Sequence, residues 1–156
     1  MKGSPLCIFL ALGILALPVH ARKQKDSLCD PLREFAASIG PDEKREIVFS
    51  TSWGENFKGE SKDVLFAKQC VHGDHGPARK VCDELMGNGS VEFGNYNAMR
   101  AITCLAPETE FGGSSFERGD FSLDVGNEDR GAHISISFDG DKEIGGMTLR
   151  ITAEGY

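Results

Sequence analysis

The sequence predicts an α+β fold: a small single domain in which helices pack on one side of a mainly antiparallel β-sheet, held by two disulfides. Three observations lead to this prediction. Apolar residues recur at helical spacing in three segments between residues 30 and 105, around one β-rich pair of segments. After residue 107 the pattern changes to short runs in which apolar and polar residues alternate. Finally, four cysteines follow an N-terminal leader, and an even number of cysteines is typical of a disulfide-bonded exported chain.

The first 21 residues, Met1–Ala21, have the features of a secretory signal peptide. Lys2 precedes an apolar run from Leu6 to Leu17, and small residues end the segment ahead of the charged Arg22. The run is shorter than the roughly 20 residues that a membrane helix needs. We therefore expect cleavage after Ala21, a single α+β domain over residues 22–156, export to the periplasm or the extracellular space, and no membrane contact after cleavage.

Three helices are expected. The first begins at Asp30, which is expected to cap the free amides, with Pro31 in the first helical position, and it stops before Gly40. The second runs from Pro77 to Met86, where a glycine-rich stop follows, and the third from about Asn95 to Leu105.

The strands are expected in two groups. Glu46–Trp53 and Val64–Val71 predict a hairpin around a polar loop at residues 56–62. After residue 107, three alternating runs predict an antiparallel meander with one face in water. These runs are Phe121–Val125, Ile134–Phe138 and Leu149–Ala153, separated by Gly126–Gly131 and by a connection that opens at Asp139–Asp141.

The cysteines that remain after cleavage are Cys29, Cys70, Cys82 and Cys104, because Cys7 lies in the leader. Four cysteines allow three connectivities. We favour Cys70 with Cys82, which closes a short loop rich in glycine, and Cys29 with Cys104, which ties the first helix to the third.

Charge and aromatic residues together predict a protein-binding role. Removing Lys2 with the leader leaves 16 Lys and Arg against 24 Asp and Glu. Such a surface disfavours nucleic acid and anionic membranes and attracts a basic protein. Exposed aromatic rings supply most of the affinity in many interfaces, so the predicted binding residues are Trp53 and Phe57 beside Glu55 and Glu60. The acidic turns at 127–130 and 139–143 are the alternative interface.

Catalytic and metal-binding signals are sparse. The chain has no nucleophile motif of a known hydrolase class, and disulfide formation would remove the thiolates as ligands. His72, Asp74 and His75 on one short loop are weak candidates for a metal, in a spacing that matches no standard zinc pattern. The sequence therefore favours an exported, acidic, disulfide-stabilised binding protein without a cofactor, such as an inhibitor or immunity factor for a basic protein. The alternative is a small exported hydrolase or a metal-binding protein that uses the His72 and His75 loop.

Overall fold

A computed structural model describes residues 25–127 and 129–156 of the protein. The predicted signal peptide, Met1–Ala21, lies outside these residues. The elements in chain order are α1 (Cys29–Ala37), β1 (Lys44–Trp53), β2 (Phe66–Val71), α2 (Gly76–Asn88), α3 (Gly94–Leu105), β3 (Gly119–Asn127), β4 (Arg130–Asp141) and β5 (Gly146–Gly155).

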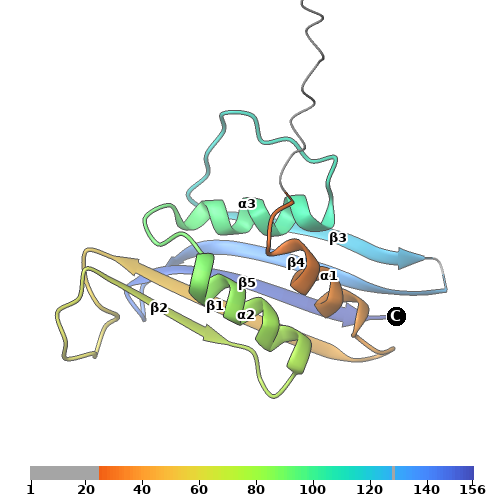
Figure 1. Ribbon diagram of the computed structural model, residues 1–156, viewed down its shortest axis with the longest axis horizontal. Helices are drawn as coiled ribbons and strands as arrows, with labels where there is room; N and C mark the ends of the chain where they lie inside the picture. Colours follow the sequence, from red (N-terminus) through yellow and green to blue (C-terminus); the bar gives the residue numbers. More distant parts are fainter. Residues whose placement is uncertain (1–24, 128) are drawn as a thin grey trace, which may run out of the picture.

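The strands form one five-stranded sheet in the order β2-β1-β5-β4-β3, and every neighbouring pair is antiparallel. All three helices lie on one face of this sheet (Figure 1). The predicted α+β fold, with helices on one side of an antiparallel sheet, is therefore confirmed. The predicted hairpin is β1–β2, and the predicted meander is β3–β4–β5.

The core lies between the helix layer and the sheet. Alternation along each central strand sends every second side chain toward the helices, which fixes which residues are buried. The largest side chains that are fully buried there are Phe35, Phe49, Leu28, Leu32, Ile47, Leu85, Ile134, Ile136, Leu149 and Ile151.

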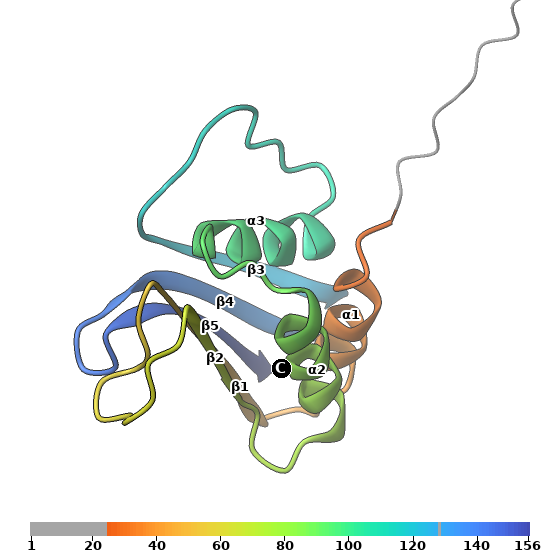
Figure 2. The same cartoon turned by 60° about the vertical axis from the view of Figure 1, so that its left-hand side comes forward.

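The opposite face of the sheet is polar, and no helix of the described residues covers it (Figure 2). Ion pairs join neighbouring strands across this face, such as Arg150 with Glu46 at 2.8 Å. The Ser50 and Thr148 hydroxyls lie 3.1 Å apart and share a hydrogen bond. Exposed ion pairs such as Arg150 with Glu46 contribute about 0–1 kcal/mol each, so the helix-side core carries most of the stability.

Both predicted disulfides are confirmed. Cys29 bonds Cys104 and ties α1 to α3, while Cys70 bonds Cys82 and ties β2 to α2. The two bridges therefore fasten the helix layer to itself and to an edge strand of the sheet.

A buried arginine adds a third connection between the N-terminal segment and the helix layer. The Arg100 side chain on α3 is only 8% exposed, and it donates hydrogen bonds to both carboxylate oxygens of Asp26 at 2.7 Å. The same guanidinium donates to Glu84 of α2 at 3.1 Å. The bonds from Arg100 hold the pKa of Asp26 below its usual value, although partial burial acts in the opposite direction.

The start of the first helix differs from the prediction. α1 begins at Cys29, one residue earlier than expected, and Asp30 lies in its first turn as the exposed partner of Lys25. The carboxylate that accepts a backbone hydrogen bond there belongs to Asp26, 2.9 Å from the amide of Leu28. The cap prediction for Asp30 was therefore wrong, because the chain turns before the Asp-Pro pair.

The glycines expected to separate the meander strands belong to the strands themselves. Gly126 pairs directly with Gly131, and a Cβ at Gly126 would lie 2.5 Å from the Arg130 carbonyl oxygen. Since neither glycine carries a side chain, the strands stay paired as far as Asn127 and Arg130. In the same way β4 continues through Asp139–Asp141, where the sequence predicted the start of a connection.

Candidate functional site

The end of the sheet where β1 meets β2 carries two exposed aromatic side chains. Trp53 is the last residue of β1 and pairs directly with Phe66, the first residue of β2. Trp53 is 58% exposed and Phe66 is 53% exposed. Directly opposed residues have Cβ atoms about 4.5–5.5 Å apart, so the two side chains form one surface, which we call the aromatic edge.

Alternation explains the direction in which the aromatic edge faces. Phe49 and Thr51 point toward the helices and are buried, so Trp53, two residues further along β1, points to the same side. The helix layer does not extend this far, because α2 ends at Asn88. The side chain of Trp53 therefore lies on the face of the sheet that packs against the helices, but beyond the end of the helix layer.

Three other predicted binding residues lie in the loop between β1 and β2. Glu55 is exposed and borders the same hollow as Trp53. Phe57 is half-buried, with its ring against β5, where a Cβ added at Gly146 would lie 3.3 Å from ring atom Cε1. Glu60 is exposed and does not border the hollow. Glu55 and Trp53 therefore border the same hollow. Phe57 packs between the loop and β5, and Glu60 lies outside the hollow.

Backbone contacts hold this loop beside the β4–β5 turn, as Figure 2 shows. The Lys58 amide donates to the Ile144 carbonyl at 2.8 Å, and the Lys58 ammonium donates to the Lys142 carbonyl at 2.7 Å. The Gly54 amide donates to the Leu65 carbonyl at 2.9 Å and closes the base of the loop. The loop is therefore a defined part of the surface next to the aromatic edge.

Two adjoining hollows open on this end of the molecule. The first, of about 630 Å³, lies between Trp53, Glu55, the α2–α3 connection and the β4–β5 hairpin. The second, of about 650 Å³, lies further along, and we call it the acidic groove; its walls include Glu92, Phe93, Phe116, Glu117, Asp139 and Met147. The hollows share Glu92, Asp139, Gly140 and Met147, so they form one continuous surface.

The charge of this surface is mostly negative. Glu55, Glu92, Asp139 and Asp141 border the first hollow, against the two cations Lys58 and Lys142. The residues of the turn at 139–143, predicted from the sequence as an alternative interface, thus lie beside Trp53 in the same surface. The other predicted turn, at 127–130, joins β3 to β4 and lies at the opposite end of the sheet (Figure 1).

Sequence reasoning missed Phe66, Glu92, Phe93 and Glu117. Phe66 became a site residue only through its register with Trp53. A signal was present for Glu92 and Phe93, since a charged and an aromatic residue follow the predicted helix stop directly. Glu117 lies in the long loop after α3, where no periodic pattern could place it.

In the loop proposed for a metal, His75 makes contacts with protein groups. His75 Nε2 lies 2.9 Å from the Ser38 hydroxyl, and its ring packs against Phe35 with centroids 5.9 Å apart. His72 and Asp74 border a hollow of about 270 Å³ with His75, but no cluster of three or more ligating side chains exists among the described residues. The geometry therefore assigns His75 a packing role.

The contact between Ser38 and His75 also bears on the hydrolase alternative. A catalytic serine donates its proton to the histidine that acts as base. Here the Ser38 hydroxyl donates to the Phe35 carbonyl at 2.7 Å, a bond that competes with donation to the imidazole 2.9 Å away. No carboxylate of the described residues hydrogen-bonds the other ring nitrogen of His75. The pair is a contact that holds the end of α1 to the start of α2.

Comparisons with protein-family models, with curated proteins and with solved structures find no match for this chain. Over residues 25–127 and 129–156, no helix is both long enough and apolar enough to cross a membrane.

Proposed function

We propose that this chain is an exported binding protein that recognises a basic protein through the aromatic edge and the acidic hollows beside it, in the manner of an inhibitor or immunity factor. The observation that carries the proposal is the exposure of Trp53 and Phe66 side by side, directly next to a hollow bordered by carboxylates. Contiguous apolar surface rimmed by polar groups is typical of protein-binding sites.

The two kinds of residue have different roles in such a site. Exposed carboxylates attract a basic partner over a distance and raise the association rate, an effect that salt screens. A buried aromatic ring supplies affinity and slows dissociation. The net charge of −7 for the whole chain supports the first role, and the aromatic edge supports the second.

Export is part of this proposal. The signal-peptide features of Met1–Ala21 support it, and so do two disulfides, since such bonds persist in oxidising compartments.

The expected contribution of Trp53 follows from its exposure. A tryptophan side chain buries up to about 250 Å² on complete burial, and 58% of this residue is exposed. Covering that area, about 145 Å², at about 25 cal/mol per Å² is worth about 3.5 kcal/mol, from which side-chain ordering subtracts up to about 1.5 kcal/mol. Trp53→Ala should therefore lower affinity by about 2 kcal/mol, or about 30-fold.

The test starts with a photo-reactive amino acid at position 53 and, in a second variant, at position 122 on the polar face of the sheet. Irradiation in the exported fraction should give an adduct with one basic protein from position 53 and none from position 122. That protein is then purified, and its binding to wild-type chain, Trp53→Ala and Tyr156→Ala is measured by calorimetry. Tyr156 is a matched control, because it is 45% exposed and lies at the other end of the sheet (Figure 1).

The proposal requires 1:1 binding that weakens about 30-fold in Trp53→Ala and less than threefold in Tyr156→Ala. Equal adducts from both positions, or equal affinity of both variants, would show that the aromatic edge is not the interface.

A further inference from the structure

The acidic groove has an aromatic wall as well as carboxylates. Phe116 is half-buried and packs edge-to-face on Phe138, with ring centroids 6.1 Å apart. α3 begins directly over this wall at Gly94, where an added Cβ would lie 3.2 Å from the Phe138 ring and 3.3 Å from Met147 Cβ. The floor of the groove is therefore apolar and formed by side chains of the core.

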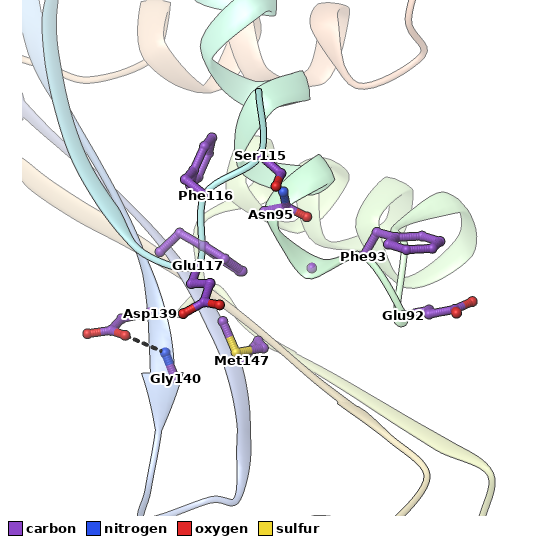
Figure 3. A pocket seen from close by; sticks show the side chains of 11 residues that line it. Glu92, Phe93, Asn95, Ser115, Phe116, Glu117, Asp139, Gly140 and Met147 are labelled. Carbon is purple, nitrogen blue, oxygen red and sulfur yellow. Dashed lines mark hydrogen bonds between the residues drawn. The ribbon is translucent and has the colours of Figure 1, made fainter. Parts of the chain in front are cut away.

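The carboxylates come from three different parts of the fold. Glu92 lies on the α2–α3 connection, Glu117 lies at the end of the loop that leads to β3, and Asp139 lies on β4. Figure 3 shows Glu117 and Asp139 on one side of Met147 in this view and Glu92 on the other. Asp139 also accepts a hydrogen bond from the Gly140 amide at 2.7 Å.

No lysine, arginine or histidine of the described residues lines this groove. Neither Glu92 nor Glu117 takes part in an ion pair or a side-chain hydrogen bond among the described residues. Both carboxylates therefore keep their acceptor oxygens for a ligand that carries positive charge.

Arginine fits these features better than lysine does. A guanidinium is planar, stacks on aromatic rings, and donates to carboxylates in a fixed fork, whereas an ammonium is a compact and strongly hydrated charge. An aromatic wall beside free carboxylates offers both kinds of contact to a guanidinium. A groove of about 650 Å³ also has ample room for one arginine side chain and its flanking backbone.

We infer that the acidic groove receives an arginine side chain from the basic partner, with the guanidinium against Phe116 and between Glu117 and Glu92. This inference rests on the proposed function, because the groove continues into the hollow beside Trp53. The partner's segment would then run from the aromatic edge to Phe116 along the residues that the two hollows share.

The test uses defined peptides in place of the unknown partner. The isotope-labelled, disulfide-bonded chain is titrated by NMR with acetyl-Arg-Gly-Arg-amide and, separately, with acetyl-Lys-Gly-Lys-amide. We expect saturable shifts of the amides of Glu92–Asn95, Glu117 and Met147, and at least fivefold tighter binding of the arginine peptide.

Two matched double variants distinguish specific binding in the groove from non-specific electrostatic attraction by the acidic chain. Glu92→Gln with Glu117→Gln should weaken arginine-peptide binding at least tenfold. Glu108→Gln with Glu110→Gln removes the same charge from the loop that follows the other end of α3, a helix about 18 Å long, and neither glutamate lines the groove, so this change should alter binding less than twofold. The NMR spectrum of each free variant confirms that it is folded. Equal loss in the two double variants, equal affinity for both peptides, or shifts centred on the turn at 127–130 would overturn the inference.

The outcome also separates this inference from the proposed function. Arginine binding in the groove together with full partner affinity of Trp53→Ala would refute the proposed aromatic interface while leaving the arginine site intact. Weakened partner binding by Trp53→Ala without arginine binding in the groove would refute the arginine site alone.

Discussion

Replacing Asp26 by asparagine should destabilise the fold far more than the same change at Asp30. Asp26 accepts two charge-assisted hydrogen bonds from Arg100, and each such bond is worth about 1.5–3 kcal/mol. Asparagine keeps one acceptor oxygen, and Glu84 still neutralises part of the arginine charge at 3.1 Å. One charged bond is therefore lost at a side chain that is only 8% exposed, so we expect a loss of about 2 kcal/mol for Asp26→Asn.

Asp30 provides the matched control. It pairs with Lys25, but both side chains are mostly exposed, and exposed pairs contribute about 0–1 kcal/mol. Asp30→Asn should therefore change the free energy of unfolding by less than about 0.5 kcal/mol.

The pH dependence gives a second readout. The pKa of Asp26 is lowered in the folded chain by Arg100, so its stabilisation is fully present above the unfolded value of about 3.9. It is lost as pH falls through the lower, folded pKa. The difference in the free energy of unfolding between wild type and Asp26→Asn should therefore be constant from pH 7 to pH 5 and decrease below about pH 4. Denaturant unfolding with intact disulfides at pH 7, 5 and 2.5 measures it. A gap no larger than that of Asp30→Asn at pH 7, or one that persists unchanged at pH 2.5, would refute this account of the Arg100 contacts.

Two further predictions concern the disulfides and a close backbone contact. The bridge between α1 and α3 joins residues 75 apart, and the bridge between β2 and α2 joins residues 12 apart. Because the longer closed loop restricts the unfolded chain more, replacing the first bridge by a serine pair should cost about 1.6 kcal/mol more than replacing the second, as measured by denaturant unfolding. Gly155→Ala should cost at least about 2 kcal/mol in the same assay, because the added Cβ would meet the Gly40 carbonyl oxygen at 2.0 Å, whereas Gly113→Ala, with open space around it, should cost less than about 0.5 kcal/mol. Equal costs within either pair would contradict the corresponding argument.

Much of the fold could be predicted because its signals are local. Helical spacing and glycine stops placed α2 and α3 to within one or two residues, and period-two alternation gave the strands of the meander. The disulfide pairing that we favoured among three possible connectivities is confirmed. The start of α1 was missed, because both Asp26 and Asp30 suit a helix start and only the path of the chain selects between them.

The site was predicted only in part, because it depends on pairing between distant strands. Trp53 was identified from its residue type and its position at the end of a strand. Its neighbours Asp139 and Asp141 come from the β4–β5 hairpin, which reaches Trp53 because β5 pairs with β1 across nearly 100 residues of sequence. Alternation predicts that strands exist but not which of them become neighbours. Trp53 and the acidic turn at 139–143, which the sequence analysis treated as separate candidates, therefore lie on one surface without any local signal that they would.

The position of the aromatic edge follows from a mismatch in length between two layers. Gly89 ends α2 where an added Cβ would lie 2.4 Å from the Leu85 carbonyl and 2.8 Å from the Phe49 ring, so the chain turns away directly over Phe49. β1 continues four residues beyond Phe49, to Trp53, and β2 pairs with it over the same length. No helix of residues 25–127 and 129–156 therefore lies above the last aromatic pair of the sheet. Packing alone does not require large rings at such positions, since a polar pair would keep the strands joined and leave less apolar surface in water. Aromatic rings at Trp53 and Phe66 fit the proposed interface, because a bound partner would bury the apolar surface that the helices leave exposed.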